Sequence, residues 1–155
     1  MIRVQAEDFD IAAEIAALGN AGHDIGAVVT FTGLVRGGGE DSNLTAMTLE
    51  HYPGMTEKAL QEIEREALER WPLEASLIIH RYGRLEPGEN IVLVITASSH
   101  RQAAFEAAEY LMDWLKTKAP FWKLEESAAG ANWVDARESD DNAVRRWSGR
   151  AAKAD

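Results

Sequence analysis

Apolar residues recur along this chain at two spacings, and these predict where its helices and strands lie. A helical repeat marks residues 10–18, residues 56–71 and the stretch from Ser99 to Pro120, and Pro72 stops the second helix. The residues expected to bound these helices are Asp10, Thr56 and the capping-box pair Ser99 and Gln102 at their starts, and Gly19 at the end of the first.

Each of the two longer predicted helices has one apolar face, which we expect to pack on a core. In the second helix, the face consists of Leu60, Ile63, Ala67, Leu68 and Trp71. In the third helix, it consists of Ala104, Ala108, Leu111 and Leu115, with Phe105 and Met112 beside it. On the outer side of the second helix, Glu66 and Arg70 are spaced to pair.

Runs rich in β-branched and aromatic residues predict strands between the helices. The expected strands are residues 27–32, 44–52, 76–82 and 90–98, and the glycine-rich segment 37–43 is expected to be a loop. The predicted order is helix, two strands, helix, two strands, helix and an irregular C-terminal part. This order predicts an α+β fold, with a mixed or antiparallel sheet packed with helices, rather than a doubly wound fold.

The composition is that of a globular protein, with 46% apolar and 27% charged residues in a chain of 155. We expect a single domain over residues 1–147 and a disordered tail over residues 148–155. No apolar run approaches the ~20 residues of a membrane-spanning helix. No signal peptide is visible, so a cytoplasmic protein is expected. The net charge of −10 argues against binding to nucleic acids or anionic membranes.

The chain contains no cysteine, which excludes disulfides, thiolate metal sites and a cysteine nucleophile. Any sulfur in its chemistry must therefore be carried by another molecule. His23, His51 and His80 do not lie at the spacing of metal ligands, and His80 sits in an apolar strand where a structural role is expected. We accordingly expect neither a metal nor another bound cofactor.

Lysines are unevenly placed, since three of the five fall within residues 116–123: Lys116, Lys118 and Lys123. One interpretation is that Lys116 and Lys118 complement the negative end of a helix dipole. The other is a cationic pocket, in which a second ammonium and the neighbouring Phe121 and Trp122 lower the pKa of a lysine toward the range useful for proton transfer.

Two further groups are suited to an anion. His100 and Arg101 follow Ser98-Ser99 at the predicted start of a helix, where free N–H groups favour phosphate, although a capped helix with solvated first-turn residues explains them as well. Arg36 precedes the glycine-rich loop, and a solvated loop arginine is the simpler interpretation. The residues by themselves therefore indicate an anion pocket with lysines beside it and leave its chemistry open.

Longer strings resemble a known family. They are VVTFTGLVR (28–36), MTLEHYPGMTEKAL (47–60), IIHRYGRLEPGE (78–89), SSHRQAAFEAAEYLMDWLKTKAPFWKLE (98–125) and WVDARESD (133–140). Together they are similar to the large, catalytic subunit of molybdopterin synthase, from about residue 26 to Trp147. The combination of EHYPGM, HR before a helix and LKTKAPFWK is much more specific than any single motif.

The resemblance implies a sulfurtransferase of molybdenum cofactor biosynthesis. It would convert cyclic pyranopterin monophosphate to molybdopterin by installing two sulfurs as a dithiolene. The sulfur would come from the C-terminal thiocarboxylate of a small ubiquitin-like partner subunit. The family's fold is α+β with a hammerhead-like β motif. The resemblance also implies a homodimer within a heterotetramer, and the C-terminal tryptophans (Trp114, Trp122, Trp133 and Trp147) include candidates for an interface.

By matching positions, the resemblance makes Lys116 and Lys123 catalytic and adds both to the substrate-binding residues Arg36, His100, Arg101 and Arg137. The individual roles of the two lysines stay open. Leu34 departs from the pattern, since family members often have a basic residue there, and the loop 37–43 looks shortened. Two other functions are weighed: a non-catalytic scaffold that docks a ubiquitin-like carrier, and an unrelated phosphate-ester enzyme using His100.

Overall fold

The computed structural model describes residues 1–19, 22–37, 43–134 and 138–148. Its strands form two four-stranded sheets, which we call sheet A and sheet B. Sheet A contains, in spatial order, β1 (Ile2–Gln5), β4 (Leu73–Arg81), β6 (Asn90–Ser98) and β2 (Ala27–Leu34). Sheet B contains β5 (Gly83–Leu85), β3 (Leu44–His51), β7 (Phe121–Ser127) and β8 (Gly130–Val134).

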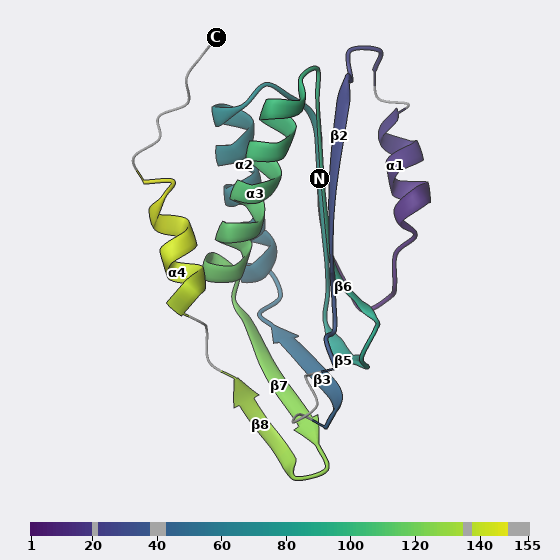
Figure 1. Cartoon of the computed structure of the whole chain (residues 1–155), viewed down its shortest axis with the longest axis vertical. Helices are drawn as coiled ribbons and strands as arrows, with labels where there is room; N and C mark the ends of the chain where they lie inside the picture. The colour runs from purple at the N-terminus through teal and green to yellow at the C-terminus, as the bar shows by residue number, and fades with distance from the viewer. Residues whose placement is uncertain (20–21, 38–42, 135–137, 149–155) are drawn as a thin grey trace.

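The helices cover both faces of sheet A, as Figure 1 shows. They are α1 (Ile11–Gly19), α2 (Met55–Arg70), α3 (Arg101–Lys118) and α4 (Glu138–Arg145). Helices α2 and α3 lie on one face with α4 outside them, and α1 lies on the other face. Sheet B extends beyond the end of this layered part, at the side where α3 passes into β7. The prediction of an α+β fold, with a mixed sheet packed with helices, is confirmed.

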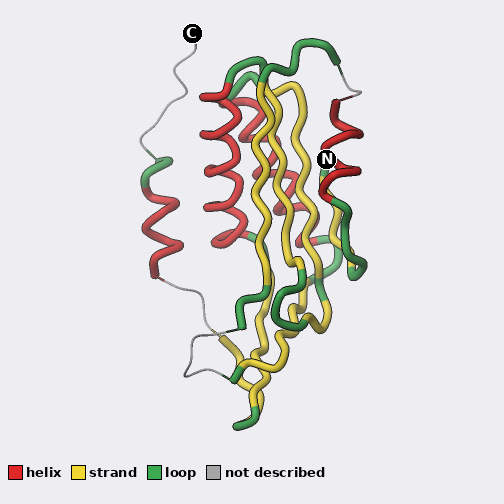
Figure 2. Tube along the Cα trace, turned by 45° about the vertical axis from the view of Figure 1, so that its right-hand side comes forward, coloured by secondary structure: helices red, strands yellow, loops and turns green. Residues whose placement is uncertain are grey.

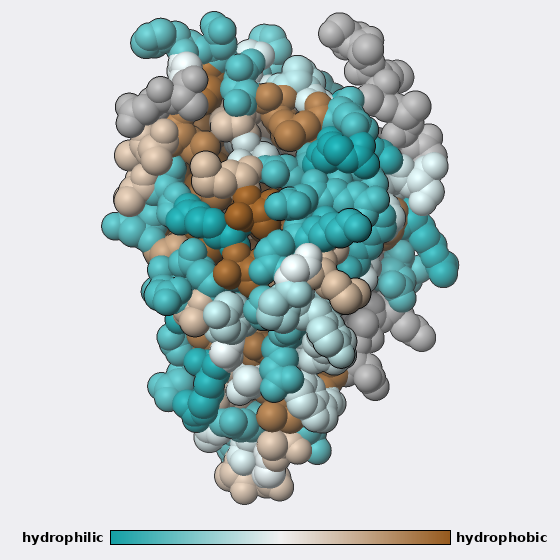
Figure 3. Space-filling view, turned by 180° about the vertical axis from the view of Figure 1, so that it is seen from behind, coloured by the Kyte–Doolittle hydropathy of each residue, from teal (hydrophilic) through white to brown (hydrophobic). Residues whose placement is uncertain are grey.

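Sheet A is mixed because β1 pairs with β4 in parallel, whereas β4 and β2 both pair with β6 antiparallel. Its two faces support separate hydrophobic clusters. The larger one lies under α2 and α3 and includes Tyr110 and Trp147, which are at most 2% exposed. Phe9 belongs to the cluster on the other face, together with apolar residues of β4 and β6. Seen from behind in Figure 3, the remaining surface apolar side chains form small groups amid hydrophilic ones.

Three of the local predictions for the helices are wrong. Thr56 does not cap α2, because the helix starts one residue earlier and the Gly54 N–H donates to the Glu57 carboxylate at 2.6 Å. The backbone at the N-cap of α2 has a φ of 84°, which glycine adopts readily and other residues rarely adopt, so Gly54 suits this position. His100, and not Ser99, is the N-cap of α3. Leu68 is 46% exposed, so it lies outside the apolar face of α2.

Other helix predictions are confirmed. The Asp10 carboxylate accepts a hydrogen bond from the Ala13 N–H at 3.0 Å and so caps α1. Helix α3 ends at Lys118, before Pro120. A contact that was not predicted involves Glu66, which was expected on the outer side of α2 beside Arg70. Its carboxylate accepts a hydrogen bond from the Tyr110 hydroxyl at 2.5 Å, which ties α2 to α3. Burial is the main cause that raises the pKa of Tyr110, and the bond to Glu66 adds to it.

The irregular C-terminal part expected from the sequence is wrong, because β7, β8 and α4 lie there. Strands β1 and β5 were also not predicted; they are only four and three residues long. Strand β7 lacks a continuous apolar run, and it is held by pairing with β3 and β8 on its two sides. Of the predicted tail, only Ser148 is among the described residues. No described helix is both long and apolar enough to cross a membrane.

Candidate active site

A shallow hollow of about 520 Å³ lies at the start of α3. It is lined by His100, Arg101, Gln102, Phe105 and Glu106. His100 makes no side-chain cap, so the first N–H groups of the helix have no such acceptor. The side chains of His100 and Arg101 are exposed, and Glu106 is engaged by Gln102 and by the indole N–H of Trp71. This end of α3 therefore combines helix N–H groups with a guanidinium and an imidazole, a combination suited to phosphate.

The start of α3 is held by close backbone packing. Gly26 donates its N–H to the Ser98 carbonyl at 3.1 Å. A Cβ on Gly26 would lie 2.3 Å from the Ser99 carbonyl oxygen, so a side chain does not fit there. The Ser98 hydroxyl donates to the Pro72 carbonyl at 2.7 Å, which anchors the turn to the end of α2. The position of His100 is thus set by three separate segments of the chain.

The lysines lie at the opposite end of α3. Lys116 is exposed in the last turn of the helix, and Lys123 is the third residue of β7. The Lys123 ammonium, 32% exposed, pairs with Glu125 at 3.1 Å. The Lys118 ammonium lies 4.2 Å from the centre of the Trp114 ring. Lys116 and Lys123 therefore flank the junction between α3 and β7, whereas Lys118 is engaged with its own helix.

Of the two aromatic residues that the pocket interpretation places beside a lysine, Trp122 does not face Lys123. Phe121 stacks on His80 at 3.7 Å between ring centres, and so joins β7 to β4. Trp122 packs edge-on against Tyr52 at 4.6 Å. Because neighbouring residues of a strand point to opposite faces, Trp122 lies on the other side of sheet B from Lys123.

Arg36 lies two residues after the end of β2 and is exposed. Val35 before it is buried, and its N–H donates to the Glu89 carbonyl at 2.9 Å. Since β2 runs antiparallel to β6, with Ala27 opposite Ser98 and Leu34 opposite Asn90, Arg36 lies far from the start of α3. Leu34, the position that departs from the family pattern, is 54% exposed.

One copy of the chain therefore places the predicted site residues in two groups. His100 and Arg101 lie at one end of α3, and Lys116 lies 15 residues further along the helix, a distance of about 22 Å at 1.5 Å per residue. Arg36 and Lys123 lie toward the same end as Lys116 (Figures 1 and 2). Arg137 lies outside the described residues.

His80 has a structural role, and the described residues form no metal site. His80 is buried, and burial lowers its pKa to about 4, while its Nδ1 lies 2.8 Å from the Arg81 carbonyl oxygen. This agrees with the structural role expected for it. In the described part of the chain, no three His, Asp or Glu side chains are grouped to hold a metal ion.

A second hollow, of about 340 Å³, was not predicted from the sequence. It lies on sheet B and is lined by Glu50, His51, Tyr52, Trp122 and Trp133. Its aromatic residues come from the end of β3 and from the neighbouring strands β7 and β8, about 70 residues further along the chain, and β8 was not predicted. The one local signal was the spacing of aromatic residues around EHYP and PFW.

Comparison with known proteins places nearly the whole chain in one family. The family model described as "MoaE protein" matches residues 4–118. The molybdopterin synthase catalytic subunit of Rhizobium meliloti is 58% identical over 151 residues, which cover 96% of each chain. A molybdopterin biosynthesis MoaE protein from Burkholderia ambifaria is 50% identical, with a TM-score of 0.82 over 97% of this chain and 99% of that one.

A more distant solved structure, molybdopterin synthase from Staphylococcus aureus, is 31% identical. It superposes with a TM-score of 0.79 over 86% of this chain and 96% of that one. The fold and these matches agree with the resemblance found in the sequence. The chain belongs to the MoaE family, the family of the catalytic subunit of molybdopterin synthase.

Proposed function

We propose that this chain is the sulfur-transferring catalytic subunit of a molybdopterin synthase and acts in the cytoplasm. Its substrate is cyclic pyranopterin monophosphate, and the sulfur comes from the thiocarboxylate at the C-terminus of a small ubiquitin-like partner subunit. The observation that carries the proposal is family membership over nearly the whole chain, 58% identical to a relative named as the catalytic subunit. That name itself implies a further subunit.

The cations suit this chemistry because both reactants are anionic. In each transfer, the thiocarboxylate sulfur forms a bond to a substrate carbon, which loses its oxygen. Water then breaks the acyl–sulfur bond, so the partner leaves as an ordinary carboxylate and the sulfur stays on the product. Positive side chains offset the repulsion between phosphate and thiocarboxylate, and an ammonium can protonate the leaving oxygen. We assign this part to Lys116 and Lys123.

We assign the substrate phosphate and pterin to Arg36, His100 and Arg101, with Arg137 lining the same pocket. Because one copy keeps His100 and Arg101 about 22 Å from Lys116 along α3, we propose that each complete site takes residues from two copies. Apolar side chains that a second copy would cover lie on the open edge strand β2 and on the first half of α3: Val28 (42% exposed), Phe31 (39%) and Phe105 (61%). A homodimer therefore supplies both the missing cations and a cover for this surface.

Reconstitution tests the proposed function. The purified chain is mixed with cyclic pyranopterin monophosphate and the thiocarboxylated small subunit, and the dithiolene product is measured by mass spectrometry. We expect product only when the partner bears the thiocarboxylate, because this chain has no cysteine to carry sulfur. The control replaces the charged partner with free sulfide and the uncharged small subunit. Equal rates in both mixtures, or no product with the charged partner, would contradict the proposal.

A further inference from the structure

Arg81 is a charged residue that the proposed function does not use. It ends β4 and is 7% exposed, although the surrounding strand is apolar. Burying a guanidinium group is costly unless its donors are satisfied. The groups that accept hydrogen bonds from Arg81 therefore indicate which parts of the structure this arginine stabilises.

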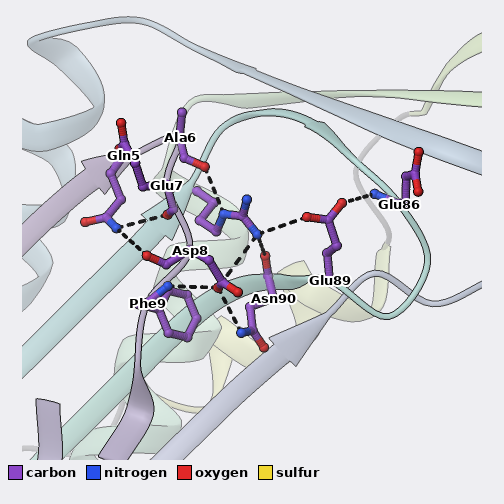
Figure 4. Close-up of polar contacts among 9 residues, drawn as sticks. Gln5, Ala6, Glu7, Asp8, Phe9, Glu86, Glu89 and Asn90 are labelled. Carbon is purple, nitrogen blue, oxygen red and sulfur yellow. Dashed lines mark hydrogen bonds and ion pairs between the residues drawn. The ribbon is translucent and has the colours of Figure 1, made fainter. Parts of the chain in front are cut away.

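The acceptors around Arg81 come from two segments that are far apart in the sequence. The Nε group donates to the Ala6 carbonyl at 3.0 Å, and Nη1 donates to the Asn90 carbonyl at 3.0 Å. Nη1 also lies 3.5 Å from a Glu89 carboxylate oxygen and 3.8 Å from Asp8. Figure 4 shows these acceptors converging from the segment after β1 and from the turn before β6.

The turn before β6 is held from several sides. Glu89 uses its other carboxylate oxygen to accept the Glu86 N–H at 2.6 Å, and its own N–H donates to the Glu86 carbonyl at 3.0 Å. The Asn90 amide donates to Asp8 at 2.9 Å. Glu89 and Asn90 are therefore fixed both within the turn and, through Arg81, to the end of sheet A.

The turn at residues 86–89 also holds the backbone next to Arg36. The Val35 N–H donates to the Glu89 carbonyl at 2.9 Å, and the Gly88 N–H donates to the Val35 carbonyl at 2.8 Å. Arg36 is the next residue along the chain after Val35. The two hydrogen bonds at Val35 are thus the last fixed point before the Arg36 side chain.

We propose that Arg81 is a positioning residue for Arg36. It fixes the turn at Glu89, and the turn fixes Val35, so that the backbone from which the Arg36 side chain extends is held in place before substrate binds. Preorganised charge binds an anion more tightly than charge that must first be ordered. The inference rests on the proposed function, in which Arg36 contacts the anionic substrate.

Amide hydrogen exchange tests the link between Arg81 and the turn without using activity. In Arg81→Met, we expect exchange at the Val35 and Gly88 amides to become at least about tenfold faster, since each tenfold change reflects about 1.4 kcal/mol of local stability. The matched control is Arg84→Gln, which removes a charge from an exposed arginine that contacts Glu86 and Glu126 only through their side chains. If Arg81→Met does not fold, Arg81→Lys takes its place, because it keeps the charge but lacks the guanidinium donors that reach both Ala6 and Asn90.

Substrate affinity tests the link to Arg36. We expect Arg36→Ala and Arg81→Met each to weaken binding of cyclic pyranopterin monophosphate about tenfold in calorimetry. We expect the double variant to bind no more weakly than Arg36→Ala, because residues that act through one another are not additive. If Arg81 instead had only a structural role unrelated to Arg36, the two single changes would weaken substrate affinity independently, and the double variant would show the product of the two losses.

The possible failures are distinguishable. Unchanged exchange at Val35 and Gly88, or losses of affinity that multiply in the double variant, would overturn the positioning role. Unchanged affinity in Arg36→Ala alone would instead show that the assignment of Arg36 in the proposed function is wrong.

Discussion

The lysines near the end of α3 differ in what surrounds them, although they are close in the sequence. The Lys118 ammonium lies over the Trp114 ring at 4.2 Å, and the Lys123 ammonium pairs with Glu125 at 3.1 Å on sheet B. Lys116 is exposed in the last helical turn. The helix-dipole interpretation predicts the same small effect for replacing Lys116 or Lys118. The catalytic interpretation predicts a loss of turnover for Lys116 and not for Lys118.

We therefore expect the alanine variants of these lysines to differ in turnover. Lys116→Ala and Lys123→Ala should each lower the rate of dithiolene formation by about 10²-fold or more, because each removes a group that transfers a proton or stabilises charge. Lys118→Ala is the control and should change the rate only slightly. Thermal unfolding measured alongside should show that all three variants remain folded. Near-normal turnover in both Lys116→Ala and Lys123→Ala would exclude the catalytic role.

A second residue-scale prediction concerns His80 and pH. Burial lowers the pKa of His80 to about 4 in the folded chain, from the ordinary value of 6.5 that applies to the unfolded chain. Between pH 4 and pH 6.5, the unfolded chain therefore binds a proton at His80 that the folded chain does not bind. The contribution of His80 to the free energy of unfolding is therefore complete above pH 6.5 and is lost as the pH falls toward 4. At 1.36 kcal/mol per pH unit, the loss amounts to about 3 kcal/mol.

Urea unfolding between pH 7 and pH 4 measures this loss. His80→Phe should lose less stability than the parent chain over the range, whereas His23→Gln, at an exposed position, should follow the parent. Parallel curves for the parent chain and His80→Phe would show that His80 is not the group that titrates.

At the scale of elements, the start of α3 depends on how closely β2 approaches it. We expect Gly26→Ala to destabilise the fold by about 1–3 kcal/mol, as is usual for overpacked sites, because the new methyl group would lie 2.3 Å from the Ser99 carbonyl oxygen. Since Ser99 precedes His100, the same change should weaken binding of cyclic pyranopterin monophosphate. Gly22→Ala is a matched control with no heavy atom within 4 Å. Chemical denaturation and calorimetry of both variants check the prediction, and equal stability of the two would contradict it.

At the scale of the whole molecule, the separation of the cations predicts complementation between two inactive variants. With substrate well below saturation, we expect Lys123→Ala and Arg101→Ala to be strongly impaired alone and to regain about a quarter of normal activity after they are unfolded and refolded together. With random pairing, half of the dimers are mixed, and one of the two sites in each mixed dimer is intact. Light scattering should give the mass of a dimer at micromolar concentration. A monomer there, or no activity in the mixture, would contradict the shared site.

Much of the architecture could be predicted from residue spacing. The amphipathic repeats located α1, α2 and α3, and Pro120 marked the end of α3, because local propensity and periodicity decide where long elements lie. Strand β7 could not be found in this way, because pairing on both sides holds it although its own sequence is mixed. The same limit applies to the cap of α2, where Gly54 and Glu57 replace the expected Thr56 through a local backbone conformation.

The sequence by itself determined which side chains are available for the chemistry: a cluster of lysines, a histidine and an arginine before a helix, and no cysteine. It also contained the long strings that identify the family. Only the tertiary structure decided where these groups lie in space. A continuous 18-residue helix is a rigid spacer, so Arg101 and Lys116 are kept apart even though their charges suit one substrate. The buried Arg81 is likewise explained by distant segments, since its acceptors come from the segment after β1 and from the residues at the start of β6.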